Sequence, residues 1–127
     1  EAVFYTKEEY DRIAEKQGNE ISKLIVEGQA GRFEKDPNAS SFVWDAITAA
    51  VWLKPEIATD IQERYVDVDT NYGPNYGRVV SWWTSRNRDV EKGEGMPYGV
   101  QKCDVLFDID REAFWDFYVD ILTTEVE

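Results

Sequence analysis

Carboxylates at one regular spacing are the residues of this chain best suited to a specific interaction. Glu112, Asp116 and Asp120 lie four residues apart near the C-terminus, so a helix would present them as one row. Arg111 is the only basic residue between Asp104 and the C-terminus, so nearby cations do not offset this row. The spacing predicts an electrostatic contact with a cationic surface. An ordinary solvated helix face is the alternative interpretation.

We expect the acidic face to act as a binding site. It comprises Asp104, Asp108, Glu112, Asp116 and Asp120. The net charge of −12, from 26 acidic and 14 basic residues, favours a basic protein partner. The same charge disfavours direct binding of nucleic acid or of an anionic membrane. The favoured function is a non-enzymatic protein-binding module, such as an inhibitor that mimics nucleic acid and occupies a basic nucleic-acid-binding protein.

The residue types needed for several kinds of catalysis are missing. The sequence has no histidine and only one cysteine, Cys103, which excludes Ser-His-Asp and Cys-His nucleophiles and leaves zinc without imidazole ligands. No phosphate-binding glycine motif and no G-x-S-x-G motif is present. We therefore predict no catalytic residues, no bound metal and no cofactor. Asp45 is the carboxylate that burial would best suit to acid–base chemistry, but a first-turn acid facing solvent is favoured.

An aromatic and basic segment supports a second function. Its candidate binding residues are Tyr76, Trp82, Trp83, Arg86 and Arg88, with Tyr72 and Tyr98 nearby. Aromatic side chains beside glycine turns can form a shelf for a small ligand, a carbohydrate or a peptide. A structural or assembly protein is the third hypothesis, and a homo-oligomer is compatible with the composition.

A short run of oxygen-bearing side chains resembles the start of a calcium-binding loop. Asp67, Asp69 and Asn71 alternate before Gly73, but position 78, where such a loop needs a bidentate glutamate, is an arginine. Asx residues and glycine are also typical of plain turns. A turn is therefore the favoured interpretation.

The elements that would position these residues indicate an α+β fold. We expect about four helices, over residues 6–25, 41–53, 55–66 and 110–122, packed on a small antiparallel sheet that pairs residues 79–84 with residues 100–108. Residues 79–90 also fit helical spacing, so a helix is the alternative interpretation of that segment. The helix over 41–53 should be buried on nearly all sides. At 127 residues the chain fits a single compact domain over 1–127. The lone cysteine and the lack of a long apolar run favour a cytoplasmic protein.

Overall fold

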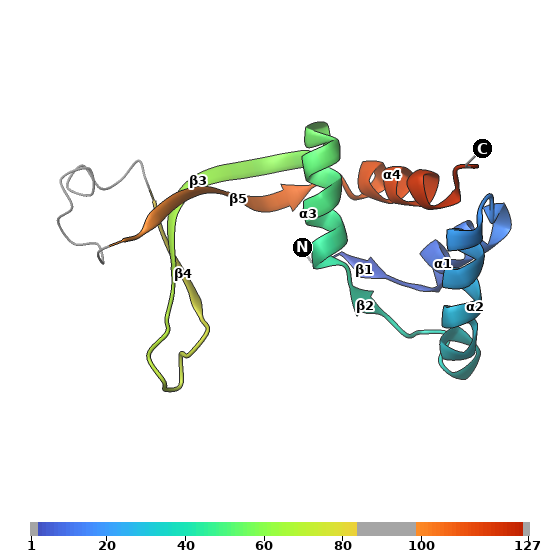
Figure 1. Ribbon diagram of the computed structural model, residues 1–127, viewed down its shortest axis with the longest axis horizontal. Coiled ribbons are helices and arrows are strands. Elements are labelled where there is room, and N and C mark those ends of the chain that lie inside the picture. The colour runs from blue at the N-terminus through green and yellow to red at the C-terminus, as the bar shows by residue number, and fades with distance from the viewer. Residues whose placement is uncertain (1–2, 84–98, 126–127) are drawn as a thin grey trace. The chain divides into compact units, whose positions relative to one another are not determined.

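A computed structural model describes residues 3–83 and 99–125 of the protein (Figure 1). It contains helices together with small antiparallel sheets, so the predicted α+β class is confirmed. The chain divides into two compact units, one formed by Glu1–Thr59 and Asp108–Glu127 and the other by Asp60–Phe107. We call these unit 1 and unit 2.

Unit 1 holds all four α-helices of the described residues. These are α1 (Lys7–Lys16), α2 (Glu20–Lys35), α3 (Trp44–Leu53) and α4 (Arg111–Thr123). A short 3-10 helix, η1 (Pro55–Ile57), follows α3, and two short strands, β1 (Phe4–Tyr5) and β2 (Ser41–Phe42), pair in antiparallel fashion. The helix α1 packs against both α2 and α4.

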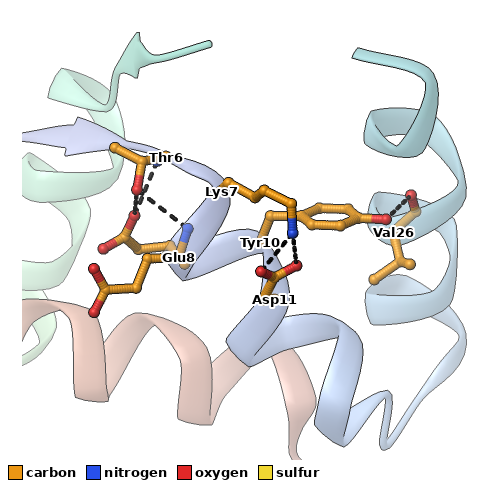
Figure 2. Close-up of polar contacts among 7 residues, drawn as sticks. Thr6, Lys7, Glu8, Tyr10, Asp11 and Val26 are labelled. Carbon is orange, nitrogen blue, oxygen red and sulfur yellow. Dashed lines mark hydrogen bonds and ion pairs between the residues drawn. The ribbon is translucent and has the colours of Figure 1, made fainter. Parts of the chain in front are cut away.

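The start of α1 is fixed by local polar contacts (Figure 2). Thr6 caps the helix, and its hydroxyl and amide both donate to the Glu9 carboxylate, which completes a capping box. One turn later, Lys7 and Asp11 form an ion pair of 2.6 Å on the helix surface. The Tyr10 hydroxyl donates to the Val26 carbonyl oxygen at 3.4 Å and so joins α1 to α2.

The predicted single helix over residues 6–25 is wrong, because it is broken into α1 and α2. Gln17 adopts a left-handed conformation with φ of 32° and ends α1. Asn19 then caps α2, with its side-chain oxygen accepting from the Ser22 amide at 2.9 Å. The Asn19 amide nitrogen also donates to the Leu122 and Thr124 carbonyl oxygens at the end of α4. The break therefore places Asn19 where it satisfies the ends of two helices.

The core of unit 1 forms where α1, α2 and α4 meet. Ile13, Phe114 and Val119 are almost fully buried there, as is Ile57 of η1. The Asp110 side chain caps α4, accepting from the Ala113 amide at 3.0 Å. On α4, Phe114, Trp115 and Val119 are buried, whereas Ile121 is 48% exposed.

Unit 2 is built mainly from a three-stranded sheet. Its strands are β3 (Ala58–Val68), β4 (Val79–Trp83) and β5 (Gln101–Ile109), in the order β4-β3-β5. The strand predicted over 79–84 is confirmed as β4. Two other expectations are wrong: residues 58–68 form a strand and not a helix, and β4 pairs with β3 and not with β5. The exposure of successive side chains alternates from Ala58 to Glu63, as expected for a strand. In the sheet, β3 lies between β4 and β5.

Candidate functional site

A cluster of exposed aromatic rings lies on unit 1 at the pairing of β1 and β2. Phe4 and Phe42 are direct partners in the register of these strands, and their ring centroids are 4.7 Å apart. Trp44, two residues after Phe42, stacks on it with a centroid distance of 4.4 Å and an interplanar angle of 17°. Phe4, Phe42 and Trp44 are 39%, 49% and 66% exposed. We call these three residues the aromatic shelf.

The shelf is supported from beneath by a buried tyrosine. Successive side chains of a strand point to opposite faces, so Tyr5 points inward where Phe4 points outward. Tyr5 is only 7% exposed and packs against Phe33 of α2 and Trp115 of α4. Burial raises the pKa of the Tyr5 hydroxyl to about 12, with a smaller contribution from nearby Tyr118. The strand that carries Phe4 is therefore anchored in the core of unit 1.

An exposed carboxylate follows the shelf directly. Asp45 lies in the first turn of α3, next to Trp44 in sequence, and its side chain is exposed as the sequence favoured. It forms no ion pair or side-chain hydrogen bond with the described residues. The backbone carbonyl of Trp44 accepts from the Thr48 hydroxyl at 3.1 Å, which fixes the first turn of α3. Flat aromatic surface and a carboxylate that can accept hydrogen bonds therefore lie side by side along the chain.

Sequence reasoning missed the aromatic shelf because it expected the helix over 41–53 to be buried. The structure instead leaves Trp44, Trp52 and Leu53 of α3 at least 66% exposed. A signal was present in the i, i+2 spacing of Phe42 and Trp44, which is the spacing of one strand face. The partner Phe4 could not be inferred, since only the pairing of β1 with β2 brings it near.

The residues of the predicted acidic face lie in two different elements. Asp104 and Asp108 are exposed residues of β5, and Glu112, Asp116 and Asp120 are exposed on α4. On α4, however, the Arg12 guanidinium of α1 pairs with the Asp116 carboxylate at 2.6 Å. Arg12, Lys16 and Lys54 also surround a polar pocket of about 310 Å³ together with Asp116 and Asp120. The expectation that the fold leaves this row without cations is therefore wrong.

The alternative aromatic and basic site is only partly visible. Arg86 and Arg88 lie outside the described residues, as does Tyr98. Tyr76 is 63% exposed, and its ring lies 5.9 Å from that of Tyr72 in the loop after β3. Trp83 of β4 is covered by the Arg64 guanidinium at 3.2 Å from its ring centroid, while Trp82 is half-buried. The structure therefore gives no single shelf that includes Tyr76, Trp82 and Trp83.

The residues that resemble a calcium loop form a turn, as the sequence favoured. The Asp69 carboxylate accepts from the Asn71 amide at 3.0 Å, and its backbone bonds to Gly77 and Arg78 close the loop. Among residues 3–83 and 99–125, no three His, Cys, Asp or Glu side chains are grouped to hold a metal ion. In the same ranges, no helix is both long enough and apolar enough to cross a membrane.

Comparison with known proteins gives matches at the level of structure. No protein-family model matches the sequence, and no curated protein matches it. Eight chains of known structure do match. An Inosine-Guanosine Nucleoside Hydrolase (IG-NH) superposes with a TM-score of 0.72 and 23% identity, over 98% of this chain and 36% of the hydrolase. The plant nucleoside hydrolase PpNRh1 gives a TM-score of 0.68 and 16% identity, over 95% of this chain and 37% of the enzyme.

These matches correct the function predicted from the sequence. At such low identity the likeness shows a shared fold, and the chain spans little more than a third of either hydrolase. Both of these proteins are nucleoside hydrolases, which are enzymes. The predictions of a non-enzymatic protein-binding module, an inhibitor and a mimic of nucleic acid are therefore wrong. The charges on α4 give a physical reason for this correction. Arg12 and Lys16 of α1 lie near Asp116 and neutralise part of the negative charge that was expected to bind a basic partner.

Proposed function

We propose that this chain forms part of a nucleoside-hydrolysing enzyme and contributes nucleoside-binding residues to it. The observation that carries the proposal is the aromatic shelf, followed in sequence by the exposed Asp45, on a chain whose fold matches that of nucleoside hydrolases. A nucleoside consists of a flat aromatic base and a ribose with several hydroxyl groups. The shelf suits the base, and the carboxylate suits the sugar.

The reaction requires water to attack C1′ of the ribose while the bond to the base nitrogen breaks. The base leaves with a proton, and the hydroxyl of the water stays on C1′, so the products are ribose and the free base. The transition state carries positive charge on the sugar ring, as in other glycoside hydrolyses. A negative group close to that charge lowers the barrier.

Each residue of the proposed site has a role that its position supports. Phe42 and Trp44 stack at 4.4 Å and expose about half or more of their surfaces, so a base can lie against them. Asp45 is free to accept hydrogen bonds from the ribose hydroxyl groups and to stabilise the positive sugar ring. The chain covers 36% of the matched hydrolase, so the remaining groups would belong to the rest of such a fold.

Nucleoside binding and hydrolysis by the assembled protein, purified after expression from its full gene, test the proposal. Calorimetric titration with inosine, together with release of free base followed by absorbance, should detect both steps. Trp44→Ala should weaken binding about tenfold or more, because stacking of one base contributes about 1–3 kcal/mol. Asp45→Asn should keep most of the binding but lower kcat about 100-fold, since it removes the negative charge and retains the shape.

Trp52→Ala is the matched control for the shelf. Trp52 is a second tryptophan of α3, is 84% exposed and lies outside the shelf. Its loss should leave nucleoside affinity within about twofold of the original value, as is usual for a surface substitution. Equal affinity of Trp44→Ala and the unchanged protein would show that the shelf does not hold the base. Absence of both binding and hydrolysis would refute the proposed function itself.

A further inference from the structure

An apolar groove runs between α3 and α4 on unit 1. A cavity of about 170 Å³ lies there, lined on the α3 side by Ala46, Ala49, Ala50 and Leu53 and on the α4 side by Phe117, Tyr118, Ile121 and Leu122. The three alanine side chains are small, so they fill little of the groove. Leu53 and Ile121 are 68% and 48% exposed. The groove is therefore an apolar surface open to solvent.

Exposed large apolar side chains outnumber buried ones in the described residues as a whole. Among the described residues, ten apolar side chains form the buried core, whereas sixteen large apolar side chains are exposed. Proteins that act as single folded chains seldom expose large continuous apolar patches, and such patches usually mark an interface. Two of these exposed side chains, Leu53 and Ile121, line the groove, so we expect another polypeptide segment to cover it.

The structural matches indicate what that segment is. Almost the whole chain aligns with IG-NH, yet it accounts for only 36% of the hydrolase, so nearly two thirds of the hydrolase chain lies outside the match. Three alanines line one wall of the groove, and small side chains let a further helix approach closely. A helix docks in such a groove through large apolar side chains spaced three or four residues apart.

We propose that the groove between α3 and α4 receives an amphipathic helix from the complementary part of a nucleoside-hydrolase-type fold. The inference rests on the proposed function for the identity of that fold. The helix brings large apolar side chains over Ala46, Ala49 and Ala50, and it is carried on the same polypeptide, as the uncovered part of IG-NH is. Docking fixes α3, and with it Trp44 and Asp45 at the start of that helix.

Site-specific photo-crosslinking tests the inference in the protein expressed from its full gene in its own host. A diazirine analogue of leucine replaces Leu53, which lines the groove and is nearly isosteric with the probe. Mass spectrometry then identifies the peptide captured after illumination. The expected peptide lies outside residues 1–127 and aligns with the part of IG-NH that this chain leaves uncovered. The same analogue at Leu24 of α2, which is 70% exposed and outside the groove, should not capture that peptide.

The other outcomes overturn the inference. Capture of a peptide from residues 1–127 of a second copy would make the groove a contact between identical chains. Capture of an unrelated protein, or yields no higher than the Leu24 probe gives, would show that no such helix occupies it.

Ala49→Glu supplies a second variant with a folding control. Ala49 is exposed in the groove, so a carboxylate there leaves the 127-residue chain folded, with Tm within about 3 °C of the original. Crosslinking from Leu53 should fall at least about tenfold, because docking would bury the unpaired charge. Undiminished crosslinking in this variant contradicts the inference.

The crosslink does not depend on catalysis, so the two proposals can fail separately. The expected crosslink without nucleoside hydrolysis by the assembled protein refutes the proposed function alone. Hydrolysis by a protein whose Leu53 probe captures something else refutes the docking inference alone.

Discussion

The Arg12 guanidinium lies 2.6 Å from the Asp116 carboxylate, although the two residues are 104 positions apart in the sequence. The pair joins α1 to α4 across the surface of unit 1. Their side chains are 37% and 64% exposed, so water and salt screen much of the attraction. A cation of α1 therefore partly neutralises the acidic row of α4. The sequence alone does not reveal that these two helices lie together.

Removing this ion pair should cost little stability. Asp116→Asn should lower the free energy of unfolding by about 0.2–1 kcal/mol at low ionic strength, and less in high salt, because exposed pairs are weak. Denaturant unfolding at two salt concentrations, with Arg12→Ala and the double variant completing the cycle, measures the coupling. Glu112→Gln is the control, since Glu112 forms no ion pair with the described residues of the chain. A coupling above about 2 kcal/mol would mean that the pair is more protected from solvent than its exposure indicates.

Gly18 is irreplaceable by any residue with a side chain. A Cβ added at Gly18 would lie 1.9 Å from the Thr123 carbonyl oxygen, which is backbone and cannot move aside as a flexible side chain can. Gly18→Ala must therefore separate the α1–α2 connection from the end of α4. We expect a loss of at least about 2–3 kcal/mol in unfolding free energy, as for other overpacked sites, measured by thermal and denaturant unfolding.

Gly28→Ala is the matched control for that substitution. Gly28 lies inside α2, and a Cβ there meets nothing within 4 Å. Alanine favours the helix over glycine by about 0.8–1 kcal/mol, so this variant should be more stable than the original. If Gly18→Ala were equally tolerated, the close approach of Thr123 would be absent from the native state.

The Tyr5 hydroxyl is buried and has no hydrogen-bond partner among the described residues. Removing it in Tyr5→Phe should leave stability at neutral pH unchanged or raise it by up to about 1 kcal/mol, because no bond is lost. Tyr10→Phe is the control, since the Tyr10 hydroxyl donates to Val26, and its loss should cost about 0.5–1 kcal/mol. A loss in Tyr5→Phe as large as that in Tyr10→Phe would reveal a hidden partner of the Tyr5 hydroxyl.

The same tyrosine should make the protein sensitive to alkali. Its pKa rises from 10.0 to about 12 through burial. Below pH 10 both the folded and unfolded chains hold this proton, so its contribution to stability is fully present. Between pH 10 and about 12 only the unfolded chain releases it, and stability falls as pH rises. Burial raises the pKa of Tyr118 too, which adds to the fall.

Denaturant unfolding at about pH 9 and pH 11 measures this effect. The fall in stability between them should be smaller in Tyr5→Phe than in the original protein. An identical fall in both proteins would assign the alkaline sensitivity to other groups.

Elements defined by local contacts were the ones that the sequence could predict. The capping box of Thr6 and the cap of Asp110 depend on residues at most three positions away, and both helices begin where expected. The break after Gln17 could not be predicted, because the bonds of Asn19 to Leu122 and Thr124 join residues more than 100 positions apart. The strand over 58–68 could not be predicted for a similar reason, because it depends on pairing with β4 and β5, which lie later in the sequence.

The candidate site was harder to predict than the fold, since it depends on what the structure leaves uncovered. Phe42 and Trp44 belong to an apolar run, and apolar runs normally indicate burial. Their exposure follows from the amount of protein packed against α3, which the local sequence does not determine. Asp45 was correctly placed in a first helical turn facing solvent, because the attraction of an acidic side chain to the positive end of a helix dipole is a local property.

Arg64 of β3 packs closely on an aromatic ring but leaves one buried nitrogen without a hydrogen bond. Its guanidinium lies 3.2 Å from the centroid of Trp83 and 5.1 Å from that of Phe107, so it packs near two rings from the neighbouring strands. Arg64 is 7% exposed, its Nε has no hydrogen-bond partner, and no carboxylate of the described ranges pairs with it. Its Nη2 donates to the Gln62 side-chain oxygen at 2.7 Å. Packing and cation–π attraction therefore oppose the cost of burying the charge.

Two substitutions separate these opposing effects. Arg64→Ala removes the cover from both rings and should destabilise the sheet by about 2 kcal/mol or more. Arg64→Met keeps a long side chain over the rings and removes the buried charge, so its cost should be at least about 1 kcal/mol smaller. Hydrogen exchange of β3 and β4 amides reports on this sheet directly. Equal losses in the two variants would show that cation–π attraction, and not coverage of the rings, holds Arg64 in place.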